Sequence, residues 1–502
     1  MDINKRKEEF HAYVEKMGGY EEAVNVMYWD MRTGAPKKGV KQRSNVLAML
    51  SSDIFSMSIS NEMAGYIKDL GDEEVKKELD AITLKMVEEC KKDYEQNQKI
   101  PEQEYREYVM LTSEAGSIWE EAKEKSDFSL FEPYLEQIVA FNQKFAEYWG
   151  YEGHKYNALL DTYEPGVTVE TLDRVFGDLK ETLLTLLQKV QKAESPKTDF
   201  LYEAFPKEKQ EAFSLEILKE LDYDFEAGRL DETVHPFAIG LNPGDVRITT
   251  KYDESDFRVA IFGTIHECGH AVYEQNISKE LVGTNLCTGT SMGIHESQSL
   301  FYELMIGRTK AFWERHYEAL KEHGGSQFQN VDLDEFYRAV NEVKPSLIRI
   351  EADELTYVLH IIIRYEIEKA LINGEIKVKD LPTIWNDKYE EYLGVRPAHD
   401  GEGVLQDVHW SDGSFGYFPS YALGYIYAAQ LKNALVKDIP DFEERIQQGK
   451  VTEIRAWLTK HIHQYGKLKD PLELLKAATG EGLEARYLVE HLTEKYSRLY
   501  NL

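Results

Sequence analysis

Residues 266–270 combine the side chains that a metal-dependent hydrolase needs. The segment reads His266-Glu267-Cys268-Gly269-His270. On a helix, positions i and i+4 lie about 40° apart and one turn up, so His266 and His270 can direct ring nitrogens at one ion. Glu267 lies at the flank of that face, where it can take a proton from a water molecule that zinc acidifies to a pKa of about 7. The spacing therefore predicts a zinc site with Glu267 as the general base.

A third ligand is expected downstream of this motif. The metzincin pattern requires Gly and His there, but Tyr273 and Asn276 occupy those positions, so that class is excluded. The alternative is a Glu from a second helix. Glu296 follows a connection long enough for a returning antiparallel helix, and we predict it as the third ligand. Glu274, one turn beyond His270, is a candidate partner of a ligand instead.

Helices must position these residues, because helical periodicity dominates the chain of 502 residues. Gly (33) and Pro (14) are sparse, which disfavours turn-rich sandwiches and barrels. Segments with helical spacing are 8–26, 73–97, 103–122, 131–149, 169–193, 301–319, 352–372, 421–435 and 451–465. No Ser/Gly-rich or Pro-rich linker divides them. We expect one large helical domain over residues 1–502, in which two lobes can flank a groove.

One segment breaks the helical pattern just upstream of the metal motif. Residues 234–241 and 245–250 read as two short strands, and Asn242-Pro243-Gly244 between them suits a turn. Because proteases often bind a substrate backbone along the edge of a sheet, this small sheet fits a peptidase.

The composition excludes several classes of partner. Lys and Arg number 59 against 90 Asp and Glu, a formal net charge of −31, which disfavours binding to nucleic acids and anionic membranes. No apolar run approaches the roughly 20 residues that span a bilayer, and the N-terminus lacks the apolar stretch of a secretory signal. Three cysteines are too few for a disulfide framework. We expect a cytoplasmic protein with reduced cysteines. Because of the negative charge, we expect peptides that end in Asp or Glu to be poor substrates.

Together the motifs resemble the carboxypeptidase Taq family of zinc metallocarboxypeptidases. Besides residues 266–270, the matching segments are His295-Glu296-Ser297-Gln298, His235-Pro236-Phe237, Asp245-Val246-Arg247-Ile248-Thr249, Ile348-Arg349-Ile350-Glu351-Ala352-Asp353, Gly403-Val404-Leu405-Gln406-Asp407-Val408-His409-Trp410 and, more weakly, Trp29-Asp30 through Pro36.

This resemblance implies a mainly α, zincin-like fold with a deep substrate groove, a small β-sheet beside the metal site, and a homodimer. It implies removal of single residues from peptide C-termini in the cytoplasm, with broad preference that excludes proline. The ligands of one Zn²⁺ would be His266, His270 and Glu296, and Glu267 would be general base and later proton donor. Co²⁺ or Mn²⁺ can substitute at a His/His/Glu site.

A carboxypeptidase must also recognise the free terminal carboxylate, which suits an arginine that donates two parallel hydrogen bonds. Arg349 and Arg247 are the arginines in the matching motifs. Arg349 has the alternative of a surface ion pair with Asp353, four residues on along an expected helix. Arg247 can instead pair with Asp245 on the same face of its strand.

Peptide hydrolysis needs a donor for the oxyanion as well. The candidates are His409, Tyr417 and Tyr421, in a Gly-rich and Pro-containing stretch that we expect to be a loop. The sequence does not choose among them. Asp353 and Asp407 are candidates for orienting a zinc histidine, with helix caps or ion pairs as the alternative.

Two other functions compete with the carboxypeptidase. A zinc oligoendopeptidase shares the ligand pattern but needs no anchor for a carboxylate. A non-catalytic, metal-stabilised binding protein is the second alternative. The presence of Glu267 disfavours it, because a structural zinc site closes with four protein ligands and needs no base.

Overall fold

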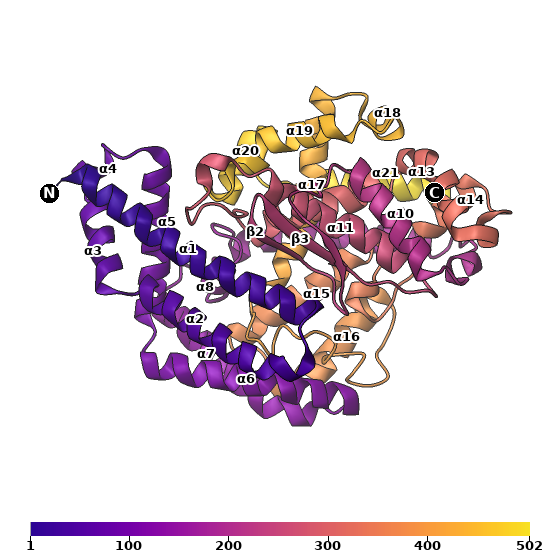
Figure 1. The fold of residues 1–502 in the computed structure, drawn as a ribbon. Helices are drawn as coiled ribbons and strands as arrows, with labels where there is room; N and C mark the ends of the chain where they lie inside the picture. Colours follow the sequence, from indigo (N-terminus) through magenta and orange to yellow (C-terminus); the bar gives the residue numbers. More distant parts are fainter. Residues whose placement is uncertain (1) are drawn as a thin grey trace.

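The computed structural model describes residues 2–502, which fold mainly into helices (Figure 1). The helices before the sheet are α1 (Ile3–Thr33), α2 (Val40–Ser58), α3 (Asn61–Leu70), α4 (Glu73–Lys76), α5 (Ala81–Lys99), α6 (Glu102–Lys125), α7 (Phe128–Trp149), α8 (Tyr156–Leu160), α9 (Val169–Val190) and α10 (Lys207–Glu220). The strands are β1 (Leu230–Glu232), β2 (Ala238–Asn242) and β3 (Asp245–Thr250). The helices after the sheet are α11 (Arg258–Gln275), α12 (Met292–Leu300), α13 (Lys310–Gly324), α14 (Leu333–Val340), α15 (Tyr357–Ile372), α16 (Leu381–Leu393), α17 (Phe418–Asp438), α18 (Phe442–Gln447), α19 (Val451–His461), α20 (Pro471–Thr479) and α21 (Arg486–Tyr500). The expected mainly α fold with a small sheet is confirmed.

Helix α9 illustrates why these segments are helical. Thr168 accepts a hydrogen bond from the backbone N–H of Thr171 and so satisfies one free donor at the helix start. Leu172, Leu179 and Leu183 then recur on one face, and all three are buried. This apolar stripe packs into the core while the opposite face meets solvent.

Two of the predicted helices are wrong as single elements. Residues 73–97 form α4 and α5, because Asp80 accepts from the backbone N–H of Thr83 and starts a new helix. Residues 301–319 begin as a π-helix, Phe301–Gly307, and continue as α13 after Thr309 caps its first turn.

The predicted strand pair is confirmed in outline, but the sheet has a third strand. β2 pairs antiparallel with β3, with Ala238 opposite Ile248, and it begins later than predicted. β1, which lacks an alternating apolar pattern, pairs parallel with β3. The order β1-β3-β2 leaves β2 at one edge.

The sheet and the helices α11 and α17 lie at the centre of the molecule (Figure 1). β3 packs on α11, with Val246 and Ile248 fully buried. α12 lies against both α11 and α17. The N-terminal helix α1 reaches the sheet region, where Trp29 meets Phe237 with ring centroids 5.5 Å apart.

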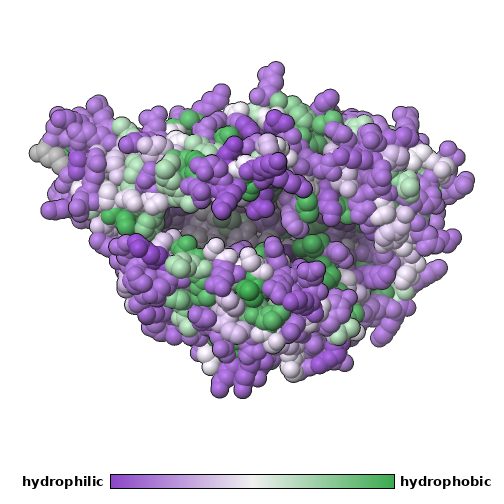
Figure 2. Space-filling view, turned by 60° about the horizontal axis from the view of Figure 1, so that its bottom comes forward, coloured by the Kyte–Doolittle hydropathy of each residue, from purple (hydrophilic) through white to green (hydrophobic). Residues whose placement is uncertain are grey.

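A long hollow crosses one face of the molecule (Figure 2). Its rim carries mixed hydrophilic and hydrophobic residues. A hollow of the kind expected for a substrate groove is therefore present on this face. Among residues 2–502, no helix has both the length and the apolar character needed to cross a bilayer.

Candidate metal centre

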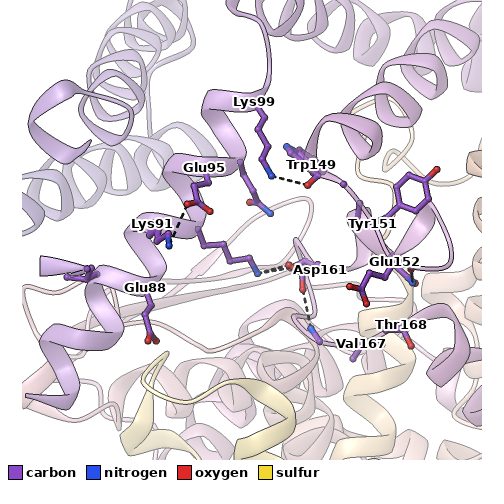
Figure 3. A pocket seen from close by; sticks show the side chains of 18 of the residues that line it. Glu88, Lys91, Glu95, Lys99, Trp149, Tyr151, Glu152, Asp161, Val167 and Thr168 are labelled. Atoms are coloured by element: carbon purple, nitrogen blue, oxygen red, sulfur yellow. Dashed lines mark hydrogen bonds and ion pairs between the residues drawn. The ribbon is translucent and has the colours of Figure 1, made fainter. Parts of the chain in front are cut away.

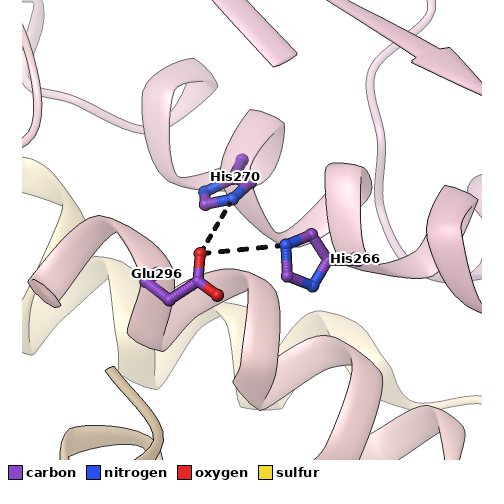
Figure 4. Close-up of side chains that lie close together, drawn as sticks. All are labelled: His266, His270 and Glu296. Carbon is purple, nitrogen blue, oxygen red and sulfur yellow. Dashed lines mark ion pairs between the residues drawn. The ribbon is translucent and has the colours of Figure 1, made fainter. Parts of the chain in front are cut away.

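Helix α11 carries the two histidines, and α12 carries the glutamate that faces them. His270 Nε2 lies 3.5 Å from Glu296 Oε2, and His266 Nε2 lies 3.8 Å from the same oxygen (Figure 4). One ligand atom from each of the three residues falls within 4.8 Å of the others. Such a cluster of two imidazoles and a carboxylate can hold a divalent cation.

Two glycines allow the helix that carries Glu296 to come this close. A Cβ on Gly269, inside the metal motif, would lie 2.6 Å from Ser299 Cα on α12. A Cβ on Gly424 of α17 would lie 2.6 Å from Glu296 Cγ. Since real Cβ atoms essentially never approach other atoms so closely, α12 fits between α11 and α17 only with glycine at both positions.

A buried carboxylate fixes the start of the same helix. Glu164 accepts from the backbone N–H of Gly293 at 2.8 Å and from the hydroxyls of Ser291 and Tyr427. Ser291 in turn caps α12 by accepting from the N–H of Ile294. Burial raises the pKa of Glu164 to about 7. These contacts set the position from which Glu296 projects.

His266 is held directly by a carboxylate. Its Nδ1 lies 3.0 Å from Glu303 Oε2, and Arg308 donates two N–H groups to the other oxygen of Glu303. Glu303 belongs to the π-helix that follows α12. Burial favours the neutral imidazole, but the negative charges of Glu296 and Glu303 outweigh it and raise the pKa of His266 to about 10. The surroundings of His266 thus favour a positive charge, which a bound cation would supply.

His270 is held through another imidazole. Its Nδ1 lies 2.6 Å from His295 Nδ1, and His295 Nε2 lies 2.8 Å from Glu274 Oε1. Burial lowers the pKa of His270 to about 4, so the ring is neutral and able to ligate. Glu274 therefore reaches a candidate ligand only through His295, a link that spacing along the chain does not reveal.

Glu267 lies beside the three candidate ligands and is only 8 % exposed. Its carboxylate has no hydrogen-bond partner among residues 2–502. Burial raises the pKa of Glu267 to about 7, although the positive charge of His266 acts to lower it. Cys268 is fully buried on the other side of α11 and takes no part in the cluster.

Arg349 is buried beside two tyrosines, Tyr357 and Tyr421, on which the charge of Glu296 acts. Its Nε donates to Asp407 Oδ1 at 2.9 Å, and its Nη1 lies 3.3 Å from the Tyr357 hydroxyl. The guanidinium also lies 4.8 Å from the ring centroid of Tyr421. Within residues 2–502, its Nη2 has no hydrogen-bond partner. The alternative ion pair with Asp353 is not formed, because Arg349 lies in the short 3₁₀ turn Arg349–Glu351 and α15 starts only at Tyr357.

Asp407 binds two arginines instead of orienting a histidine. Arg364 donates to its Oδ2 from both Nε and Nη2, at 2.7 and 2.6 Å. Burial opposes the ionisation of Asp407, but Arg364 and Arg349 hold its pKa well below the usual range. Asp353 accepts from the backbone N–H and the hydroxyl of Thr356 and so holds the turn that precedes α15. Neither aspartate contacts a candidate metal ligand.

Arg247 forms the ion pair with Asp245 that the sequence offered as the alternative to substrate binding. Its Nε and Nη2 donate to both oxygens of Asp245, at 2.7 and 2.6 Å, on the same strand. Its guanidinium lies 5.7 Å from the ring of Trp29. Both terminal contacts of this side chain are therefore made within the sheet region.

The three oxyanion candidates lie together. His409 Nε2 is 3.2 Å from the hydroxyl of Tyr421, and the rings of Tyr417 and Tyr421 are 5.2 Å apart. Burial lowers the pKa of His409 to about 4. Burial and then neighbouring groups, Glu296 among them, raise the pKa of both tyrosines. Tyr421 lies on the first turn of α17 and not in the loop that precedes it.

The stretch before α17 is irregular yet tied down by one carboxylate. Glu368 of α15 accepts from Trp410 Nε1 at 2.8 Å, from the N–H of Gly416 at 3.0 Å and from the hydroxyl of Tyr156 at 2.5 Å. Burial raises the pKa of Glu368 to about 7. Its contacts fix the segment that carries His409 and Tyr417.

Several residues of the site escaped sequence reasoning. His295 and Gln298 belong to the motif at residues 295–298, but their partners lie outside that motif. Gln298 Oε1, for example, is 2.9 Å from His463 Nε2. Ser299 donates to Glu296, and Glu303 follows in a segment without a motif. Tyr357 contacts Arg349. Only their contacts across the fold identify them.

A separate pocket of about 540 Å³ lies beside α5 and the loop after α7 (Figure 3). Several of its charged groups have partners: Lys91 pairs with Glu95, Lys92 pairs with Asp161, and Lys99 donates to the carbonyl of Trp149. None of the metal-cluster residues lines it. This pocket is therefore separate from the candidate metal centre.

Comparisons with known proteins agree with this geometry. The model of the carboxypeptidase Taq (M32) metallopeptidase family matches residues 9–496. Carboxypeptidase 1 of Bacillus subtilis is 57 % identical over 100 % of both chains, and Thermostable carboxypeptidase 1 of Thermus thermophilus is 41 % identical over 97 % of this chain and 96 % of its own. The crystal structure of the M32 carboxypeptidase from Deinococcus radiodurans R1, 33 % identical, superposes with a TM-score of 0.96 over 99 % of this chain and 100 % of that one. The chain belongs to the carboxypeptidase Taq (M32) family and is a metallocarboxypeptidase that uses a divalent metal.

Proposed function

We propose that this metallocarboxypeptidase uses zinc, with Glu267 as general base, to release single residues of broad side-chain type, but not proline, from peptide C-termini. The observation that carries the proposal is the convergence of His266, His270 and Glu296 within 4.8 Å beside the buried Glu267. Zinc suits two imidazoles and one carboxylate, and Co²⁺ or Mn²⁺ can replace it. A divalent ion held by these three residues would lower the pKa of a bound water molecule and polarise the scissile carbonyl.

Glu267 takes the proton of the attacking water and later gives it to the leaving amine. Its carboxylate is not engaged with any other group of residues 2–502, and its pKa of about 7 suits exchange of a proton near neutral pH. The same residue thus serves both halves of the reaction without a second acid.

Arg349 holds the terminal carboxylate of the substrate. Asp407 neutralises only one of the two guanidiniums that it contacts, so the Arg349–Asp407–Arg364 group has one positive charge left over. Among residues 2–502, Nη2 of Arg349 has no hydrogen-bond partner. Tyr357 and Tyr421 contact Arg349 and feel the charge of Glu296, so the anchor adjoins the metal cluster. Arg247, paired with Asp245, has the weaker claim.

Tyr421 and His409 stabilise the developing negative charge on the carbonyl oxygen. If neutral His409 donates from Nε2 to the phenol oxygen, the hydroxyl of Tyr421 is free to donate to the substrate. Tyr417 packs beside Tyr421 and is the alternative donor. Replacing each tyrosine by Phe, with kcat and KM measured separately, distinguishes the two.

A ladder assay tests the proposal. The zinc content of the purified enzyme is measured, and a peptide is then digested with a free or an amidated C-terminus, with and without chelator. We expect stepwise loss of residues from the free peptide only, abolished by chelator and halted at proline. Cleavage of the amidated peptide at internal bonds would favour the oligoendopeptidase, and zinc binding without any cleavage would favour a metal-stabilised binding protein.

We further propose that residues 1–502 form one domain, and that the enzyme is a cytoplasmic homodimer. The single domain is supported by the family match over residues 9–496, and the location and the dimer by the family resemblance. Light scattering of the purified enzyme measures the mass of the assembly, and cell fractionation gives the location.

A further inference from the structure

The second histidine of the metal cluster ends a chain of three hydrogen-bonding side chains. His270 Nδ1 lies 2.6 Å from His295 Nδ1, and His295 Nε2 lies 2.8 Å from Glu274 Oε1. Glu274 is 8 % exposed, and its Oε1 also accepts from the N–H of Gly289 at 3.3 Å. Both ring nitrogens of His295 are therefore engaged, so this histidine has none left for an ion.

The chemistry of the end group sets the direction of the whole chain. An ionised carboxylate only accepts hydrogen bonds, so His295 carries its proton on Nε2. A neutral imidazole has one N–H, so His295 Nδ1 is an acceptor. His270 must then donate from Nδ1, which leaves the lone pair of its Nε2 free, 3.5 Å from Glu296 Oε2.

We propose that Glu274 and His295 are positioning residues that fix the tautomer and the ring orientation of His270 so that its Nε2 faces the ion. This inference rests on the metal site of the proposed function. The other histidine needs no such intermediary, because Glu303 contacts His266 directly.

The opposite direction has a clear consequence. If His295 donated from Nδ1, His270 would accept there and carry its proton on Nε2, where the ion must bind. Loss of the acceptor on His295 removes the bias between the two tautomers. Ion binding must then select the correct one and also restrain a ring that nothing holds from behind.

Two replacements of His295 separate this role from simple packing. His295→Asn can keep an acceptor close to the position of Nδ1, whereas His295→Leu is similar in size but offers none. We expect His295→Leu to weaken zinc binding to metal-stripped enzyme by about 10- to 100-fold and His295→Asn by about threefold, measured by competition with a chromophoric chelator. Glu274→Gln, which keeps the shape and can still accept, should fall between wild type and His295→Leu.

Glu280→Gln is the control, because Glu280 is exposed and makes no side-chain contact with the cluster. Equal affinities for His295→Leu and His295→Asn would overturn the inference, since packing alone would then explain the loss. If wild-type enzyme bound no zinc, the proposed function itself would fail. If wild-type enzyme bound zinc but the two His295 variants bound it equally well, only the positioning role of Glu274 and His295 would fail.

A second measurement needs neither metal nor activity and serves if His295→Leu does not fold. In metal-free enzyme labelled with ¹⁵N-histidine, two-bond couplings report which nitrogen of each ring carries the proton. We expect His270 to hold it on Nδ1 in the wild type and to show a mixture in Glu274→Gln. A proton on Nε2 of His270 in the wild type would overturn the inference.

Discussion

The metal cluster takes its three candidate ligands from two helices that follow one another in the chain. The group around Arg349 instead collects residues far apart, with Asp407 contacting Arg349 across 58 positions. The metal cluster depends on close approach of helices at Gly269 and Gly424, whereas the Arg349 group depends on buried charges that hold irregular segments. The candidate metal ligands and the proposed base thus lie on two packed helices, and the proposed carboxylate anchor lies on a segment held by ion pairs and hydrogen bonds.

The largest effect should come from the metal side of this comparison. Glu267→Gln keeps the size of the side chain but cannot take a proton, so we expect kcat to fall by about 10³-fold or more. Zinc content, measured by elemental analysis, should stay at the wild-type level. Glu322→Gln, at an exposed position, is the control. Activity within about tenfold of wild type would exclude Glu267 as the base.

The next largest effect should come from the arginine side. Arg349→Met removes the proposed anchor, and we expect kcat/KM for peptides with a free C-terminus to fall about a hundredfold, about 2.7 kcal/mol. The loss should be mainly in KM. Arg247→Met should cost much less, because Arg247 is already paired with Asp245. The reverse order of the two variants would transfer the anchor role to Arg247.

The helix contact at the metal cluster can be broken from outside the site. Gly424→Ala places a methyl group against Glu296, so we expect a loss of about 1–3 kcal/mol in the free energy of unfolding and weaker zinc binding. Gly263→Ala on α11 is the matched control, since nothing lies within 4 Å of its added Cβ. That change should stabilise the protein by up to about 1 kcal/mol. Denaturant unfolding of metal-free enzyme measures both, and similar effects of the two variants would refute the packing argument.

Glu368 tests how the segment before α17 is held. Its pKa is about 7 when folded, against an ordinary value of 4.5, so between these values the folded protein binds a proton that the unfolded chain has released. The contribution of Glu368 to stability therefore falls as the pH rises through this window. Glu368→Gln should reduce that slope, as measured by unfolding at about pH 5 and about pH 7.5. An unchanged slope would mean that Glu368 is ionised in the folded protein throughout.

The smallest effect concerns both regions, because the net charge of −31 surrounds them. We expect peptides that end in Asp or Glu to react a few-fold more slowly than matched peptides that end in Lys, and added salt to reduce the difference. The ratio of kcat/KM at low and high ionic strength measures it. If the ratio of kcat/KM for acidic and basic peptide ends were the same at low and high ionic strength, the groove would not share the overall negative charge.

Residues 266–270 could be predicted from the sequence because an i, i+4 spacing on a helix is a local property. Glu296 followed from the length of one connection. The partners of Arg349 and His266 could not be predicted, because Asp407 and Glu303 meet them only through tertiary packing. Glu274 was named as a candidate partner of a ligand, but its connection to His270 through His295 was not foreseen. The family resemblance identified the motif around Arg349, and the alternative that local spacing offered, an ion pair with Asp353, is not formed.

The fold shows the same limit. Amphipathic helices and the turn after β2 have local signals, and these were predicted. β1 was missed because three residues, Leu230–Glu232, carry no alternation, and its pairing with β3 comes from contacts distant in sequence. The break before α5 depends on a single cap at Asp80, which periodicity does not reveal.

The π-helix Phe301–Gly307 makes the length of this segment matter as much as its composition. A π-helical turn holds one residue more than an α-helical turn, so deleting a single residue there would restore regular α geometry. Because the π turn absorbs the extra residue, a deletion before Glu303 would leave α13 nearly in place but would move Glu303 to a different position around the helix. His266 would then lose its carboxylate partner, although the Glu303 side chain was still encoded. For this stretch of chain, an indel is therefore a more severe lesion than most point substitutions.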